Sequence, residues 1–260
     1  MALLPFDPEV AYSDPEFLAS DDARPLRILA EYLGPLRSFR EAGVHGTIVF
    51  FGSARLTAEG PLGRYYQAAR ELAAAITRWS ASLQSGRQRY VICSGGGGGI
   101  MEAANRGATE AGGRTIGLNI CLPHEQHPNS FITPELSFEF HYFFMRKLWF
   151  AHLARALVVF PGGFGTLDEL TEILTLSQTG KLDTKIPVVL FGKEYWNEII
   201  DFEALVRHGM IGAADLKLFD YADDVDTALQ LIQAQLSAPA ARDEPVFAHS
   251  KTRRPGRART

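Results

Sequence analysis

Residues 161–169, with the sequence PGGFGTLDE, form the part of the chain whose residue types could do chemistry. The apolar run 156–160 before them has the length and valine content of a buried strand, and a helix is predicted after the glycines. Glycine lets a ligand approach the backbone closely, so free N–H groups of this turn can bind an anion. The helix dipole strengthens that attraction. We therefore predict a phosphate-sized anion site at the carboxyl end of this strand.

A second glycine turn and a basic pair are further candidates for the same site. The glycine run 95–99 follows an apolar segment, 90–93, and precedes a predicted helix at 100–111. Arg146 and Lys147 stand in a stretch rich in aromatic residues. A solvated helix face explains most basic pairs, but charges in so apolar a stretch favour contact with an anionic group.

Two carboxylates have purely structural explanations. Thr166 and Glu169 fit the capping box T-x-x-E, in which both side chains only satisfy backbone donors, and by itself this interpretation is the stronger one. For Glu102, at the start of the helix after the other glycine turn, interaction with the helix dipole is the favoured interpretation. A catalytic role for Glu169 therefore depends on its neighbours.

Several familiar sites are excluded by spacing. Neither glycine turn completes G-x-G-x-x-G, because Ile100 and Asp168 stand where the last glycine is required. The pair Gly180 and Lys181 lacks the first glycine and the Ser or Thr of a P-loop. The histidines at 124 and 127 are three residues apart, whereas the helical zinc pair of H-E-x-x-H needs four. We expect no metal and no cofactor.

Composition and periodicity predict one α/β domain. The chain has 260 residues, of which 46% are hydrophobic and 22% are charged, with a formal net charge of -4. Six strand-like segments alternate with helical patterns, at 47–51, 90–93, 115–120, 137–142, 156–160 and 186–191. This alternation favours a Rossmann-like, doubly wound, mainly parallel sheet with helices on both faces. The net charge gives no reason to expect a nucleic acid as the main partner.

We divide the chain into three parts. Residues 1–40 are expected to be an N-terminal extension packed on the domain, 41–238 the Rossmann-like domain, and 239–260 a basic, disordered tail. The apolar residues that recur at helical spacing in the extension are Leu26, Leu29, Ala30 and Leu33.

The chain is expected to be cytoplasmic. Cys93 and Cys121 lie in apolar, strand-like context, so we expect both to be reduced core thiols in a cytosolic protein. No apolar stretch approaches the roughly 20 residues needed to span a bilayer. Residues 1–6 lack the basic start of a signal peptide. We therefore expect no membrane partner.

These motifs carry a family resemblance. PGGFGTLDE at 161–169 resembles the PGGxGTxxE signature of the LOG family of cytokinin riboside 5'-monophosphate phosphoribohydrolases, long misnamed lysine decarboxylases. Arg146 and Lys147 resemble the RK pair that precedes this signature, and 94–108 is similar to the first glycine loop of the family, with Gly98 in place of a common proline. The resemblance covers about residues 45–235.

The resemblance implies hydrolysis of the N-glycosidic bond of a nucleoside 5'-monophosphate, AMP or a cytokinin riboside 5'-monophosphate, to free base and ribose 5-phosphate. It implies Glu169 and Arg146 as the catalytic residues, with the phosphate on the N–H groups of Gly163, Gly165 and Thr166. It also implies a homodimer or larger homo-oligomer with the site near the interface. The substrate-binding residues expected on these grounds are Gly162, Gly163, Phe164, Gly165, Thr166, Lys147, Glu125, Thr175, Gly97 and Ser53.

Three other functions stay open. A non-catalytic protein of the same fold that carries a nucleotide or molybdenum cofactor would not require the Arg146 and Glu169 pair. A lysine decarboxylase would need pyridoxal phosphate on a Schiff-base lysine, and nothing in the sequence indicates that arrangement. A nucleic-acid-binding protein is disfavoured by the net charge.

Overall fold

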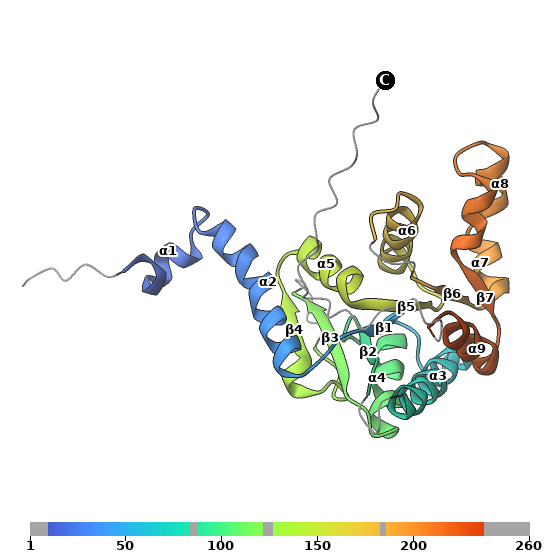
Figure 1. Ribbon diagram of the computed structural model, residues 1–260, viewed down its shortest axis with the longest axis horizontal. Coiled ribbons are helices and arrows are strands. Elements are labelled where there is room, and N and C mark those ends of the chain that lie inside the picture. Colours follow the sequence, from blue (N-terminus) through green and yellow to red (C-terminus); the bar gives the residue numbers. More distant parts are fainter. Residues whose placement is uncertain (1–9, 84–87, 122–126, 183–185, 237–260) are drawn as a thin grey trace, which may run out of the picture.

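The computed structural model describes residues 10–83, 88–121, 127–182 and 186–236 of the chain (Figure 1). The predictions for Glu125 and for the basic tail from residue 239 lie outside these residues.

One seven-stranded parallel sheet forms the centre of the described structure. Its strands are β1 (Thr47–Phe51), β2 (Val91–Ser94), β3 (Thr115–Ile120), β4 (Ser137–Phe140), β5 (Ala154–Val159), β6 (Val188–Phe191) and β7 (Asp220–Ala222). The order across the sheet is β4-β3-β2-β1-β5-β6-β7, with every neighbouring pair parallel. The chain thus runs outward from β1 to β4 and returns to β5 beside β1. This reversal creates a topological switch point between β1 and β5, where open α/β sheets bind ligands.

Helices cover both faces of the sheet, so the predicted doubly wound fold is confirmed (Figure 1). In β1, Ile48 and Phe50 point to one face and Val49 and Phe51 to the other, as the period of a strand requires. The first face packs against α3 (Gly63–Ser82), α4 (Ile100–Glu110) and α9 (Val225–Leu236). The second packs against α2 (Arg24–Glu41), α5 (Phe143–Leu153), α6 (Phe164–Gln178) and α7 (Lys193–Ile199).

The six predicted strands are all present, and 47–51 and 115–120 have the predicted bounds. Strand β7 was not predicted, because three residues at the edge of a sheet are too few to show a periodic pattern. The helices α1 (Pro15–Ala19) and α8 (Phe202–Arg207) were also not predicted, because they too are too short to show a periodic pattern. No helix in the described part of the chain is long and apolar enough to cross a membrane.

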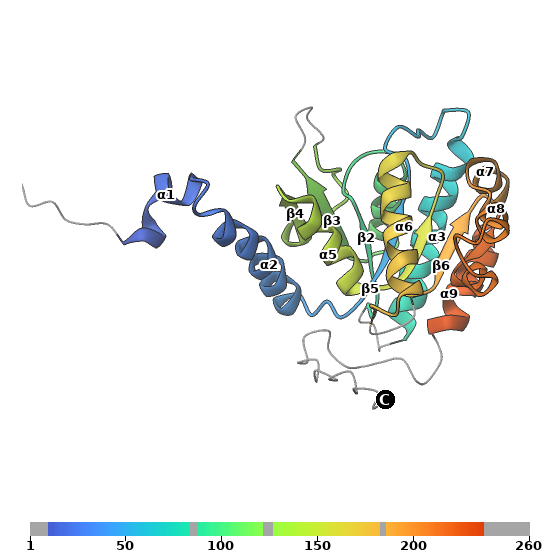
Figure 2. The same cartoon turned by 90° about the horizontal axis from the view of Figure 1, so that it is seen from above.

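The side of α2 that packs on the domain is not the predicted one. Leu26, Leu29 and Leu33 are about half exposed, at 47%, 50% and 49%. Burial is instead centred on Phe39, on the adjacent side of the helix, where Tyr32 also packs on the core and α2 contacts α5. In both views α1 and the start of α2 extend away from the sheet (Figure 1 and Figure 2). The periodic leucines therefore mark a solvent-facing stripe.

One of the two cysteines differs from the prediction. Cys93, in β2, is buried as expected, and this burial raises the pKa of its thiol. Cys121 is exposed, so the expectation of a core thiol was wrong there. It directly follows the last residue of β3, Ile120, where the chain leaves the sheet.

Helix α4 packs closely on α3 at Gly107. A Cβ at this position would overlap the backbone carbonyl of Arg70, and backbone cannot yield as a side chain can. We expect Gly107→Ala to lower the free energy of unfolding by about 2 kcal/mol, the usual cost of overpacking, as measured by urea denaturation. In an open helix the same change raises stability by about 1 kcal/mol. An unchanged or increased stability would therefore contradict the close packing.

Candidate functional site

Three turns meet at the switch point of the sheet and line a cavity of about 840 Å³. They follow β1, β2 and β5 at the carboxyl ends of these strands and contribute Ser53, Gly95 and the run 162–167. Helices α5 and α6 complete the walls with Arg146 and Glu169. Both predicted glycine turns therefore belong to one site, together with the turn after β1.

The turn after β1 is held between the two glycine turns. The amide of Ser53 donates to the carbonyl of Pro161 at 2.9 Å, and the amide of Ile100 donates to the carbonyl of Ser53 at 3.1 Å. Gly99 has φ +62° and approaches this turn so closely that a Cβ would overlap the Ser53 carbonyl. Glycine at this position is thus required for both conformation and space.

The first turn of α6 presents backbone donors to the cavity. The helix begins at Phe164 with Gly163 as its N-cap, so its first amides have no acceptor within the helix. The amides of Thr166 and Leu167 donate to the carbonyl of Gly163, both at 3.0 Å. Thr166 was predicted to bind phosphate through its N–H, but that group is already engaged. The amides of Gly163, Phe164 and Gly165 remain as the candidate anion donors.

An ion pair between α5 and α6 forms one wall of the cavity. Arg146 Nη2 donates to Glu169 Oε1 at 3.2 Å, and the two side chains are only 14% and 6% exposed. The guanidinium carbon lies 5.3 Å from the ring centroid of Phe143 and 5.6 Å from that of Phe150. Among the described residues that line this cavity, Glu169 is the only carboxylate.

The capping-box interpretation of Glu169 is wrong. Since α6 starts at Phe164, Glu169 lies more than one turn inside the helix, where the backbone amides already have partners. Its carboxylate is directed to Arg146 instead. The sequence matched T-x-x-E because Thr166 and Glu169 are three residues apart, although neither is at a capping position.

Burial dominates the electrostatics of this pair. It raises the pKa of Glu169 from 4.5 to about 7, although the positive charges of Arg146 and Lys147 act in the opposite direction. Burial also lowers the pKa of Arg146, and the interaction with Glu169 offsets part of this effect. A carboxyl group that titrates near neutral pH, within a cavity and beside an arginine, is typical of a functional site.

Some predicted residues lie elsewhere. Lys147 does not line this cavity, and its Nζ instead contacts Asp168 at 2.9 Å and Glu172 at 3.0 Å. Thr175 is exposed on α6 and donates to the carbonyl of Thr171. Gly97 also does not line the cavity. The other predicted substrate-binding residues in the described part of the chain do line it, namely Ser53, Gly162, Gly163, Phe164, Gly165 and Thr166.

Gly97 belongs to a network that holds the first glycine turn. Asn129 Nδ2 donates to the carbonyls of Gly96 at 3.1 Å and Gly97 at 3.0 Å, and to Asn105 Oδ1 at 3.0 Å. Sequence reasoning missed Asn129, because an asparagine in a loop has no local signal of its partner. It also missed Tyr195, whose hydroxyl donates to the carbonyl of Gly162 at 2.8 Å.

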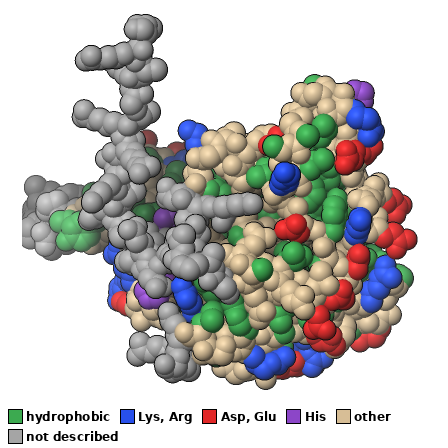
Figure 3. Space-filling model, turned by 45° about the vertical axis from the view of Figure 1, so that its right-hand side comes forward, with side chains coloured by type: hydrophobic (Ala, Val, Ile, Leu, Met, Phe, Trp, Pro, Cys, Tyr) green, Lys and Arg blue, Asp and Glu red, His purple; other side chains and the backbone are tan. Residues whose placement is uncertain are grey.

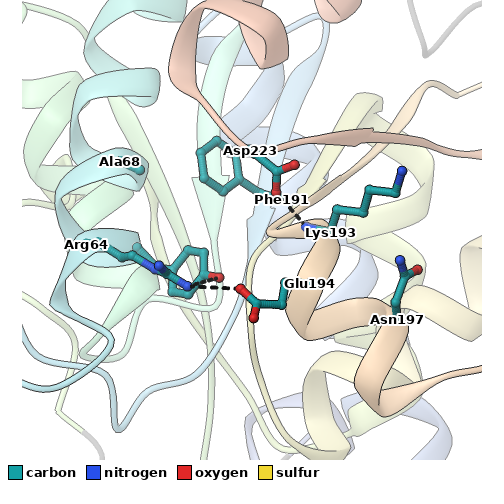
Figure 4. A pocket seen from close by; sticks show the side chains of 8 residues that line it. Arg64, Ala68, Phe191, Lys193, Glu194, Asn197 and Asp223 are labelled. Carbon is teal, nitrogen blue, oxygen red and sulfur yellow. Dashed lines mark hydrogen bonds and ion pairs between the residues drawn. The ribbon is translucent and has the colours of Figure 1, made fainter.

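Two further pockets accompany this cavity. One of about 380 Å³ adjoins it and shares five lining residues with it, namely Ser53, Arg55, Gly162, Gly163 and Tyr195. Another of about 530 Å³ lies apart, between the start of α3 and α7 (Figure 4). In it Arg64 lies 4.0 Å from Glu194, and the amide of Lys193 donates to Asp223.

The surface shown in Figure 3 carries acidic and basic side chains side by side. Among the described residues on that face, this mixture forms no continuous positive patch of the kind that a nucleic-acid backbone requires.

The chain resembles known proteins over the region of the site. The family described as "Possible lysine decarboxylase" matches residues 101–232, about half of the chain. A probable cytokinin riboside 5'-monophosphate phosphoribohydrolase of Oryza sativa subsp. japonica is 30% identical over 58% of this chain and 67% of its own length. The chain belongs to the LOG family. Residues 161–169 lie inside the matched region, whereas Ser53 lies before it.

A second LOG family relative and a solved structure extend the comparison. The cytokinin riboside 5'-monophosphate phosphoribohydrolase of Rhodococcoides fascians is 28% identical over 66% of this chain and 82% of its own length. The molybdenum cofactor binding protein of Rippkaea orientalis is 19% identical, covers 74% of this chain and 98% of its own, and has a TM-score of 0.51. This last similarity concerns the fold.

The raised pKa of Glu169 predicts a pH-dependent stability. Because the folded protein holds this proton more tightly than the unfolded chain, stability falls as pH rises from about 4.5 to about 7. Relative to Glu169→Gln, the wild type should lose on the order of 3 kcal/mol of unfolding free energy across this window. Urea denaturation at several pH values measures the difference, in which any constant effect of the substitution cancels. Parallel curves for the two proteins would contradict the buried carboxyl.

Proposed function

We propose that this protein hydrolyses the N-glycosidic bond of nucleoside 5'-monophosphates, releasing the free base and ribose 5-phosphate. The observation that carries the proposal is the buried pair of Arg146 and Glu169 in a cavity that the glycine turn at the start of α6 also lines. The names of two LOG family relatives, both cytokinin riboside 5'-monophosphate phosphoribohydrolases, support it.

Glu169 has the chemistry that the sugar requires. Breaking the glycosidic bond leaves positive charge on the ribose ring, as in other reactions with an oxocarbenium-like transition state. An ionised carboxylate beside the ring stabilises that charge and can accept a proton from the attacking water. With a pKa of about 7, Glu169 is a stronger base than an ordinary carboxylate and is still ionised in a large fraction of molecules at neutral pH.

Arg146 is proposed to act on the leaving base. The base takes up the electrons of the broken bond, and a guanidinium beside it stabilises the negative charge that develops. Contacts with the rings of Phe143 and Phe150 and the ion pair with Glu169 restrict the position of the guanidinium before the substrate binds. The amides of Gly163, Phe164 and Gly165 are proposed to bind the phosphate.

The cavity walls suit a flat heterocycle but do not select one base. Phe143, Met101 and Ile199 line the cavity around the charged pair, and Phe164 is 91% exposed at the first turn of α6. The names of the relatives suggest AMP or a cytokinin riboside 5'-monophosphate as the first substrates to test.

We also propose that the site lies near the interface of a homodimer or larger homo-oligomer in the cytoplasm. Three large apolar side chains of α5, those of Phe143, Phe144 and Leu148, are 51%, 50% and 40% exposed beside the cavity. Their burial against a second copy would remove apolar surface from water. Sedimentation of the purified chain tests this directly.

Glu169→Gln should reduce the rate of base release from AMP by roughly two or more orders of magnitude, because the shape is kept and the charge is lost. The matched control is Glu172→Gln, which removes the same charge one turn further along α6, where Glu172 contacts Lys147. Chromatographic measurement of adenine and of ribose 5-phosphate gives the rate. Equal rates in the wild type and Glu169→Gln would refute the catalytic role.

The products that the wild-type protein forms from nucleoside monophosphates distinguish an enzyme from a carrier. A carrier of a nucleotide or of molybdenum cofactor would bind AMP or the cofactor and leave every nucleoside monophosphate intact. Release of base from a panel of purine, pyrimidine and prenylated adenine monophosphates is the expected result and would also identify the preferred base.

The pH dependence of kcat/KM should follow the ionisation of Glu169. Because the carboxylate is the active form, kcat/KM should rise with pH and level off above about 7. Glu169→Asp, which keeps a carboxylate, should retain a rising profile, whereas the residual activity of Glu169→Gln should lose this inflection. A wild-type profile that falls between pH 6 and 8 would contradict an ionised Glu169.

A further inference from the structure

Arg55 lines both the 840 Å³ cavity, which holds Arg146 and Glu169, and the adjoining 380 Å³ cavity. The second cavity has no other charged residue among its described walls. Both cavities also include Gly162 and Gly163 of the anion-binding turn. Arg55 and this turn therefore border the same space.

The backbone of Arg55 is fixed by its neighbours. Its amide donates to Ser53 Oγ at 3.1 Å, and Ser53 is itself hydrogen-bonded to both glycine turns through Pro161 and Ile100. The side chain remains exposed. Arg55 thus combines a rigid attachment with a guanidinium that is free to reach into the cavity.

The other cations near the site are already neutralised by carboxylates. Arg146 pairs with Glu169, and Lys147 pairs with Asp168 and Glu172. The structure records no hydrogen bond or ion pair of the Arg55 guanidinium with any described residue. A dianionic phosphate at the glycine turn would therefore find one uncompensated cation among the described walls, and that cation is Arg55.

We propose that Arg55 binds the 5'-phosphate of the substrate together with the amides of Gly163 and Gly165, and so makes the site selective for nucleotides over nucleosides. This inference rests on the proposed function for the identity of the ligand. A guanidinium can donate two parallel hydrogen bonds to a phosphate, and such charge-assisted bonds are stronger than those from neutral amides. The amides fix where the phosphate lies, and Arg55 supplies the charge.

The kinetic test compares AMP with adenosine, which differs only in lacking the phosphate. Arg55→Gln should lower kcat/KM for AMP by about 10- to 100-fold, mainly through a higher KM, and should not lower the rate measured with adenosine. Arg64→Gln is the matched control, because it removes the same charge from the separate pocket of Figure 4. Unchanged kinetics for AMP, or an equal loss for both substrates, would overturn the proposal.

A binding measurement separates this proposal from the proposed reaction. Calorimetric titration with AMP and with adenosine compares Glu169→Gln, in which hydrolysis is slow enough for binding to be measured, with the double variant Glu169→Gln/Arg55→Gln. The expected result is an AMP affinity that is about 10- to 100-fold weaker in the double variant, with adenosine affinity unchanged. If the wild type binds AMP without releasing adenine, the hydrolase proposal fails while the Arg55 comparison still holds. An AMP affinity unaffected by Arg55→Gln in a double variant with the melting temperature of Glu169→Gln would refute the role of Arg55.

Discussion

The burial of Glu169 beside Arg146 is the interaction on which the site depends. Removing a carboxylate and a guanidinium from water costs hydration free energy, and one hydrogen bond of 3.2 Å does not fully replace it. The pKa of Glu169, raised to about 7 by burial, is the measure of that cost. A carboxylate in a surface ion pair would remain better stabilised by water, and its pKa would not be raised toward neutral pH. The fold tolerates this pair because β5 places α5 and α6 on the same face of a large apolar sheet.

A second constraint is steric and concerns how closely three turns can approach one another. The turn after β1 lies between the glycine turns after β2 and β5, with main-chain hydrogen bonds to each. This approach needs glycine at Gly99, which meets the Ser53 carbonyl, and within the turn after β5 a Cβ at Gly162 would overlap the side chain of Thr166. Backbone amides and the positive end of α6 are thereby collected at one point. The glycines thus contribute by letting the three turns pack closely enough for their backbone amides to face one cavity.

Much of the architecture was readable from the sequence because buried parallel strands are continuous apolar runs with glycines at their ends. The proximity of Arg146 and Glu169 was predicted only through the resemblance to the LOG family, which placed both residues in one site. The packing side of α2 was not predictable, because that helix has apolar residues on two sides and periodicity alone does not say which is covered. Arg55 and Asn129 were missed for a related reason. Arg55 borders a cavity together with residues 161–163, and Asn129 contacts the turn at Gly96, and no local sequence pattern reports neighbours so far along the chain.

The placement of the two thiols has a practical consequence for spectroscopy. Cys93 is enclosed in β2 with a raised pKa, which makes it a poor nucleophile toward thiol reagents. Cys121 is exposed, and the chain contains no third cysteine. A maleimide dye or spin label would therefore attach at a single position on the wild-type protein. That position directly follows Ile120, a residue of the cavity wall, so the probe would report on ligand entry without any engineered cysteine.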